Sequence, residues 1–504
     1  MNPDILPGLL SVITSPMTLL FILVGTVVGI IFGAIPGLTA TMAIVMFLPA
    51  TYAMSATEGI STLVALYIGG ISGGLVSAIL LNIPGTPSSA ATCFDGRPMA
   101  DKGQAPKALG VGIFFSFLGT IFGVIMLVLI SPLLAKIAIK FGPYDYCMLS
   151  VFSLSLVIAL TGKDMTKGII SAVVGAMLAT VGLSPIDSRQ RYTFGSVNLT
   201  AGFKLLVLLI GLFAITEVLK EAQNVRKDKG FTTTDENVKI KGLGFTMQEF
   251  VSQIRNAIVS AFIGLGIGIL PGIGGGVSCM LSYAVSKNTS KYPEKYGTGI
   301  IDGLVASETA NNAGIGGAMI PLLSLGIPGD PATAMLLGGF MVHDLAPGPL
   351  IFQKNGPIMY GIFTAMVIAS IVMLVFMFIG IRGIIKVLKV PKYYLLPVIV
   401  ILCCVGAIGD SNRMFDVWGV LLFGLLGFLF SKAEIPTTPM ILGFILGPMF
   451  EENMRRASQL ASSDPMYNHP IAMTFLVITV IAVVLSVRSN LKAAKAAAAA
   501  EAEE

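Results

Sequence analysis

Charged residues are scarce in this sequence, and their scarcity decides its class. Of the 504 residues 12% are charged and 55% are hydrophobic, and the mean hydropathy is +0.86. Soluble domains carry about 25% charged residues, so the composition excludes a water-soluble enzyme. The net charge of +5 is modest and lies in loops, which excludes the dense basic face of a nucleic-acid-binding protein.

Cysteine and histidine are also few. The five cysteines include no pair at CxxC spacing, which argues against a zinc site and a disulfide framework. The first basic residue is Arg97, so the positively charged start that a signal peptide needs is missing. Of the two histidines, His343 is a candidate proton carrier, although a structural role near a helix end is more common. We expect no catalytic site and no cofactor.

Glycine and proline, by contrast, are abundant. The 57 glycines and 27 prolines interrupt the apolar runs, because proline removes a backbone donor and glycine weakens a helix interior. A helix needs about 20 apolar residues to cross a bilayer, and the runs are either about that long or about half of it. We predict an all-α polytopic membrane protein with roughly 10–14 transmembrane or hairpin segments and Pro-Gly-broken helices.

The interruptions in the second half of the chain repeat those in the first half. Two pairs of segments match in order, Ile35-Pro36-Gly37 with Leu270-Pro271-Gly272 and Ile83-Pro84-Gly85 with Ile327-Pro328-Gly329. We predict membrane repeats at residues 1–219 and 255–457, joined by a basic linker at 220–254 that the positive-inside rule places in the cytoplasm. A final transmembrane segment at 458–491 and an Ala-rich charged tail at 492–504 follow. Repeated halves with broken helices are typical of secondary transporters, and the pattern leaves open whether the halves are parallel or inverted.

The broken helices also predict where a substrate binds. At a break the backbone loses hydrogen-bond partners that lipid cannot replace, and a helix that restarts there directs its amides and positive dipole end at the gap. Such a gap favours an anion, and a carboxylate can bind without arginine. The candidate substrate-binding residues are Gly37, Thr39, Thr41, Thr86, Ser88, Ser89, Gly272, Gly274, Gly275, Ser278, Asn311 and Thr333. Ordinary helix capping by the hydroxyls and close packing by the glycines remain alternatives.

Two further polar positions are candidates for a coupling ion. Asn311 and Asn312 lie between apolar stretches, where a side-chain oxygen can bind a hard cation such as Na⁺. Asp330 would repel an anionic substrate unless it binds a cation or a proton, although it can equally cap the helix that follows. We predict a Na⁺ site at Asn312 and Asp330, with H⁺ as the other possible coupling ion.

The motifs resemble a known family. The segments that carry the resemblance are Gly33–Met42, Asn82–Thr92, Leu270–Gly276 and Ala310–Ala313. They are similar to the large membrane subunit, TctA, of tripartite tricarboxylate transporters. The resemblance implies a permease of the bacterial inner membrane that works with a small integral-membrane subunit and a periplasmic solute-binding protein. It implies uptake of tri- or dicarboxylates driven by an ion gradient, commonly Na⁺, and the chain indeed lacks the GxxxxGK[ST] phosphate loop of ATP-driven systems. Asp330 departs from the small neutral residue expected there, which leaves the charge of the substrate open.

Two other functions fit parts of the sequence. One is a stand-alone ion-coupled carrier or channel that needs no binding protein. The other is an intramembrane serine protease, because Gly70-Ile71-Ser72-Gly73 matches GxSG and His343 could act as the base. A short motif of this kind arises easily in a glycine-rich chain and leaves the repeat unexplained, so we favour transport.

Overall fold

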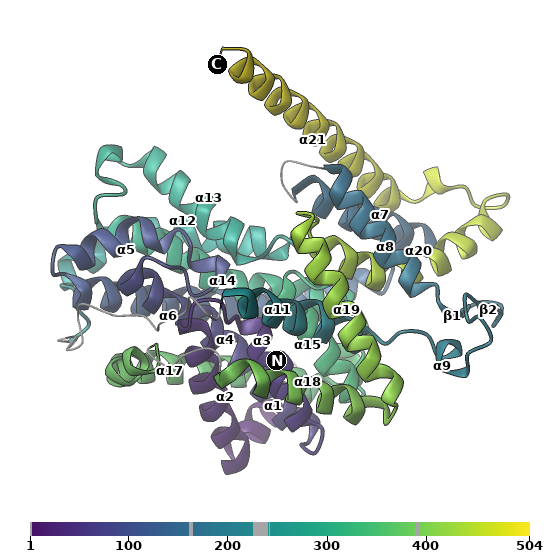
Figure 1. Cartoon of the computed structure of the whole chain (residues 1–504), viewed down its shortest axis with the longest axis horizontal. Coiled ribbons are helices and arrows are strands. Elements are labelled where there is room, and N and C mark those ends of the chain that lie inside the picture. Colours follow the sequence, from purple (N-terminus) through teal and green to yellow (C-terminus); the bar gives the residue numbers. More distant parts are fainter. Residues whose placement is uncertain (1–2, 161–164, 225–239, 241, 389–393, 504) are drawn as a thin grey trace.

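The computed structural model describes residues 3–160, 165–224, 240, 242–388 and 394–503, and these are almost entirely helical (Figure 1). Within them seven helices are long and apolar enough to cross a membrane. They are α2 (Pro16–Ala34), α4 (Ala56–Leu81), α6 (Ala105–Ala138), α12 (Met247–Ile269), α17 (Gly356–Val387), α19 (Met414–Lys432) and α21 (Pro470–Glu503). The predicted all-α polytopic membrane protein is confirmed.

Shorter elements connect and flank these spans. The apolar helices of intermediate length are α3 (Ala40–Thr51), α7 (Pro143–Leu160), α8 (Met165–Ala179), α15 (Pro331–Val342) and α18 (Leu395–Ser411). The other helices of nine residues or more are α1 (Ile5–Ile13), α5 (Thr92–Asp101), α11 (Thr216–Asn224), α13 (Gly274–Thr289), α14 (Ile301–Leu325) and α20 (Thr438–Leu460). Short helical turns are η1 (Pro87–Ser89), α9 (Val197–Thr200), α10 (Leu205–Leu209), the π-helical η2 (Ile210–Ile215), η4 (Pro293–Lys295), α16 (Ile351–Lys354) and η6 (Met466–Asn468), and one small hairpin pairs β1 (Gly182–Leu183) with β2 (Gln190–Arg191).

The predicted Pro-Gly breaks separate pairs of helices. Helix α2 ends at Ala34 and α3 begins at Ala40, while α12 ends at Ile269 and α13 begins at Gly274. In both gaps the glycine after the proline has a positive φ, 87° at Gly37 and 73° at Gly272, a conformation that other residues adopt only with strain. The local sequence therefore turns the chain at these points.

Helices α4 and α14 run in opposite directions through the centre of the protein. Near the end of α4, Ile79 lies with Leu304 of α14 beside Gly96. Earlier in α4, Ser72 bonds Asn312, and Tyr67 bonds Asp330 beyond the end of α14. Inverted repeats would place equivalent helices in this antiparallel way, although the repeat itself stays a prediction.

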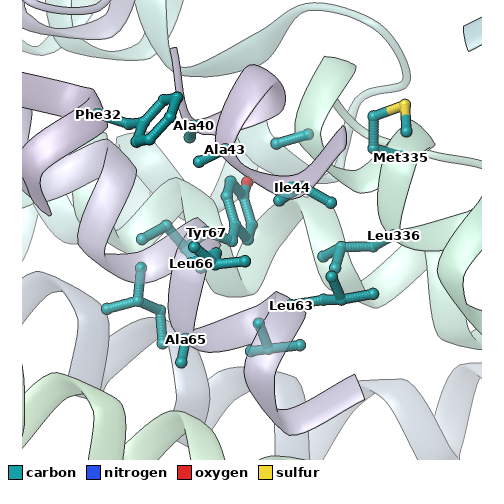
Figure 2. Close-up of a cluster of buried hydrophobic side chains, with 14 of the residues drawn as sticks. Phe32, Ala40, Ala43, Ile44, Leu63, Ala65, Leu66, Tyr67, Met335 and Leu336 are labelled. Carbon is teal, nitrogen blue, oxygen red and sulfur yellow. The ribbon is translucent and has the colours of Figure 1, made fainter. Parts of the chain in front are cut away.

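The breaks pack around a shared apolar core. Figure 2 shows Tyr67 of α4 among side chains of α2, α3 and α15, and its ring is only 1% exposed. Helices α2 and α4 approach so closely that a Cβ on Gly33 would lie 2.0 Å from the carbonyl oxygen of Gly70. Only glycine allows this approach. One core therefore holds the elements on both sides of the first break.

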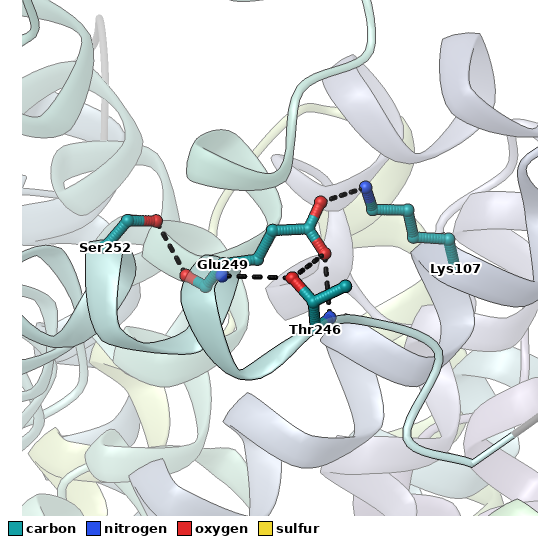
Figure 3. Close-up of polar contacts among 4 residues, drawn as sticks. All are labelled: Lys107, Thr246, Glu249 and Ser252. Carbon is teal, nitrogen blue, oxygen red and sulfur yellow. Dashed lines mark hydrogen bonds and ion pairs between the residues drawn. The ribbon is translucent and has the colours of Figure 1, made fainter.

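The predicted linker at 220–254 is bounded by helices. Its first residues belong to α11, residues 225–239 and 241 lie outside the described residues, and its last residues begin α12. Thr246 caps α12, and Glu249 accepts a hydrogen bond from the Thr246 amide at 2.8 Å and pairs with Lys107 of α6 (Figure 3). Helices α7, α8, α20 and α21 pack on one side of the body, and α21 continues through the Ala-rich tail (Figure 1).

Candidate functional site

A cavity of about 360 Å³ lies where the breaks of the two halves meet. Helices α3, α13 and α15 all begin at its wall, because Ala40, Gly274 and Pro331 line it. Three helix N-termini, with their positive dipole ends, thus lie at one space, and of the three only α13 has no side-chain cap.

Hydroxyl groups add donors to the same cavity. Thr39, Thr41, Thr86 and Ser88 line it, and the hydroxyls of Thr86 and Ser88 lie 2.9 Å apart. Thr39 also caps α3, because its Oγ1 accepts a hydrogen bond from the Met42 amide at 3.2 Å. Thr39 therefore caps a helix and lines the cavity at the same time, so the two roles are not alternatives for this residue.

Asp330 caps α15 at the edge of the cavity. Its Oδ1 accepts hydrogen bonds from the amide and the hydroxyl of Thr333, both at 2.7 Å, and its Oδ2 accepts one from the Tyr67 hydroxyl. The residue is 9% exposed and lines the cavity. The capping role is observed, and it brings a titratable carboxyl group to the edge of the predicted anion site.

Asn311 borders a second, smaller cavity of about 10 Å³, which is close to the space of one water molecule. Ser278 and Asp330 also line this cavity. Asn311 is 2% exposed, and no described residue forms a hydrogen bond with its Oδ1 or its Nδ2. A buried amide without partners is costly, so this side chain is suited to a ligand that supplies them.

Asn312 lies on another face of α14. Its Oδ1 accepts hydrogen bonds from the Ser72 hydroxyl at 2.7 Å and the Thr120 hydroxyl at 3.3 Å. Its Nδ2 donates to the backbone oxygen of Glu308, whose buried carboxylate is bonded by the hydroxyls of Thr92 and Ser116. Asn312 lines neither cavity. Its predicted part in a Na⁺ site stays a prediction.

The two residues of the protease alternative are far apart. His343 lies beside Gly59 near the start of α4, and its Nε2 is 3.2 Å from the Thr51 hydroxyl. Ser72 is thirteen residues further along α4, which corresponds to about 20 Å of helix. The structure therefore does not form the serine–histidine pair.

Nine of the fourteen predicted residues line at least one of the two cavities. Thr39, Thr41, Thr86, Ser88, Gly274, Gly275 and Asp330 line the larger cavity, and Gly274, Gly275, Ser278, Asn311 and Asp330 line the smaller one. Gly37, Ser89, Gly272, Asn312 and Thr333 line neither cavity. Gly37 and Gly272 shape the breaks instead, while Ser89 bonds the backbone of Thr86 and Thr333 bonds Asp330.

One wall of the larger cavity was missed in the sequence. It is formed by residues of η2 and α11, namely Leu212, Phe213, Thr216, Glu217 and Lys220. Lys220 is the only basic residue among the described residues that line this cavity. Lys220 follows an apolar run, so the sequence indicated only that a linker begins there. No local pattern shows that the helix carrying Lys220 lines a cavity with the helix breaks.

Comparison with known proteins shows which family this chain resembles. The chain matches the tripartite tricarboxylate transporter TctA family over residues 19–442. It is 32% identical over 486 residues, 94% of this chain and 95% of the relative, to an uncharacterized 52.8 kDa protein in the TAR-I ttuC' 3'region of Agrobacterium vitis. It is 33% identical over 199 residues, 39% of this chain and 82% of the relative, to an uncharacterized protein in the TAR-II ttuC' 3'region of the same organism. No solved structure matches. The chain therefore belongs to the tripartite tricarboxylate transporter TctA family, as its motifs predicted, and is a multi-pass membrane protein of that transporter family.

Proposed function

We propose that this chain is the large permease subunit of a tripartite system that imports tri- or dicarboxylates across the bacterial inner membrane. Its partners would be a small integral-membrane subunit and a periplasmic solute-binding protein. Membership of the TctA family supports this proposal, because the family belongs to systems of three components. The observation that carries the proposal is the cavity at which three helices begin.

The chemistry of the cavity supports an anionic substrate. The amides at the starts of α3 and α13 can bind carboxylate oxygens, as helix N-termini commonly do, whereas the start of α15 is capped by Asp330. The hydroxyls of Thr39, Thr86 and Ser88 can donate further hydrogen bonds. A site between the breaks of the two halves would suit alternating access, in which the halves move against each other around a fixed site.

The coupling ion in this proposal is Na⁺, bound in the smaller cavity. Asn311, predicted above as a substrate ligand, would supply an amide oxygen in place of Asn312, which does not line this cavity. Asp330 would supply a charge that offsets that of the ion. The cation would in turn reduce the repulsion between Asp330 and a bound carboxylate. Binding of the ion and of the substrate would then favour each other, which is the basis of symport.

Reconstitution tests the tripartite mechanism. The chain is placed in proteoliposomes with the small membrane subunit, and uptake of labelled citrate and succinate is measured with and without the solute-binding protein. We expect uptake only when the binding protein is present outside and a Na⁺ gradient points inward. Equal uptake without the binding protein would favour the stand-alone carrier, and uptake driven equally well by a proton gradient alone would assign H⁺ as the coupling ion.

A further inference from the structure

The cavity wall formed by η2 and α11 has a backbone that is held in place by hydrogen bonds. The turn Ile210–Ile215 is π-helical, a local feature that often occurs at functional sites. The hydroxyl of Thr216 donates to the carbonyl of Gly211 at 3.2 Å and to that of Gly424 at 3.1 Å. The second bond ties this turn to α19, which also packs against α11 (Figure 1). The position from which Lys220 extends is therefore set by the fold.

The side chain of Lys220, in contrast, is loosely held. Its Nζ lies 3.3 Å from Oε2 of Glu217, one turn earlier on α11. The two side chains are 41% and 28% exposed, and an ion pair in such surroundings contributes little to stability. Lysine has a flexible stem and a compact charge, so Lys220 can exchange Glu217 for another carboxylate at small cost.

The other walls of the cavity indicate which kind of substrate would carry the carboxylate that Lys220 binds. The helix starts and hydroxyls can bind one carboxylate. Among the described residues that line the cavity, they include no basic side chain that could bind a second one. Lys220 offers a separate positive charge in the same space. We propose that Lys220 is a specificity-determining residue that leaves Glu217 to bind the second carboxylate of a substrate whose first carboxylate lies at the helix starts. This inference rests on the proposed function and adds to it the residue that distinguishes dicarboxylates from monocarboxylates.

Two probes of nearly equal size test this role. Succinate carries two carboxylates, whereas in its monoamide, succinamate, one of them is neutral. Apparent Kd values are obtained from thermal-shift titrations of the purified full-length chain with each probe. The wild type should bind succinate about tenfold more tightly than succinamate, which corresponds to about 1.4 kcal/mol.

Variants assign the preference to one side chain. Lys220→Gln should bind both probes equally, with succinamate binding unchanged, while Lys220→Arg should retain the preference. Glu217→Gln should strengthen succinate binding, because the competing carboxylate is gone. Lys432→Gln is the matched control, since Lys432 bonds Gln223 of α11 at 2.9 Å and does not line the cavity. This variant should behave as the wild type.

Each contrary result has a distinct meaning. A wild-type preference that persists in Lys220→Gln, or a loss of both probes in a Lys220→Gln variant that still unfolds in a wild-type-like thermal transition, overturns the role of Lys220 and leaves the proposed function standing. If no carboxylate, citrate included, stabilises the wild type, the anion site of the proposed function fails and the role of Lys220 fails with it. Unchanged succinamate binding shows that Lys220→Gln is folded.

Discussion

At the residue scale, two adjacent asparagines have opposite surroundings. Asn312 is bonded by Ser72 and Thr120 and donates to the backbone of Glu308, whereas no described residue bonds the side chain of Asn311. Successive residues of a helix point about 100° apart, and of these two only Asn311 lines a cavity. The sequence predicted that both asparagines are functional. It could not predict which one faces a cavity, because this depends on how α14 packs against α4 and α6.

This contrast predicts different effects for two alanine substitutions. Asn312→Ala should lower the free energy of unfolding by about 1–3 kcal/mol, because buried hydroxyls lose their acceptor. Asn311→Ala should leave stability almost unchanged and lower Na⁺-dependent uptake, because it removes a ligand atom and no protein hydrogen bond. Denaturation of the purified variants and uptake at several Na⁺ concentrations measure both effects. A stable Asn312→Ala together with a fully active Asn311→Ala would contradict these assignments.

Asp330 allows capping and charge to be separated. Asparagine is a good N-cap, so Asp330→Asn should keep α15 capped while it removes the negative charge. We expect near-wild-type thermal stability but a weaker dependence of uptake on Na⁺. Asp330→Ala should show the same transport defect and also lose about 1–3 kcal/mol of stability, because α15 loses its cap and the buried Tyr67 hydroxyl loses its acceptor. If Asp330→Asn retains the full Na⁺ dependence, Asp330 is a cap and does not bind the coupling ion.

At the scale of the element, the breaks were predicted well and the wall that faces them was not. Pro36-Gly37 and Pro271-Gly272 turn the chain for local reasons, because proline interrupts a helix and glycine adopts a positive φ. The position of Lys220, in contrast, depends on a π-helical turn and on the contact of Thr216 with α19. These contacts join segments about 200 residues apart, and no local pattern encodes them.

The antiparallel course of α4 and α14 makes a prediction about sidedness. The start of α4 and the loop before α14 should lie on opposite sides of the membrane. That loop carries Lys291 and Lys295, so the positive-inside rule places it in the cytoplasm. We expect a cysteine at Ser55 to react with a membrane-impermeant thiol reagent from the periplasmic side, and a cysteine at Lys291 to react from the cytoplasmic side. The background variant lacks the five native cysteines. Reaction of both positions from the same side would refute this topology.

At the scale of the whole molecule, composition and motif order identified a membrane transporter before any contact was known. The low charge and the broken apolar runs follow from the demands of the bilayer on the backbone, so they are visible in the sequence. The cavity is a property of the assembled chain, since its lining comes from residues between Thr39 and Thr437. The proposed transport function requires that the substrate binds in this cavity during transport.

A side chain placed in the cavity tests that claim most directly. Gly276 lines the cavity, and a Cβ there would meet its nearest neighbour at 3.4 Å, so Gly276→Leu should fold and fill the space. Gly266→Leu is the matched control, because a Cβ there has no neighbour within 4 Å and the residue does not line the cavity. The measurement is uptake of a labelled carboxylate by proteoliposomes that contain the complete system. We predict that Gly276→Leu loses at least about 90% of uptake, the tenfold effect of about 1.4 kcal/mol, while Gly266→Leu keeps it. Wild-type uptake by a folded Gly276→Leu would contradict the account.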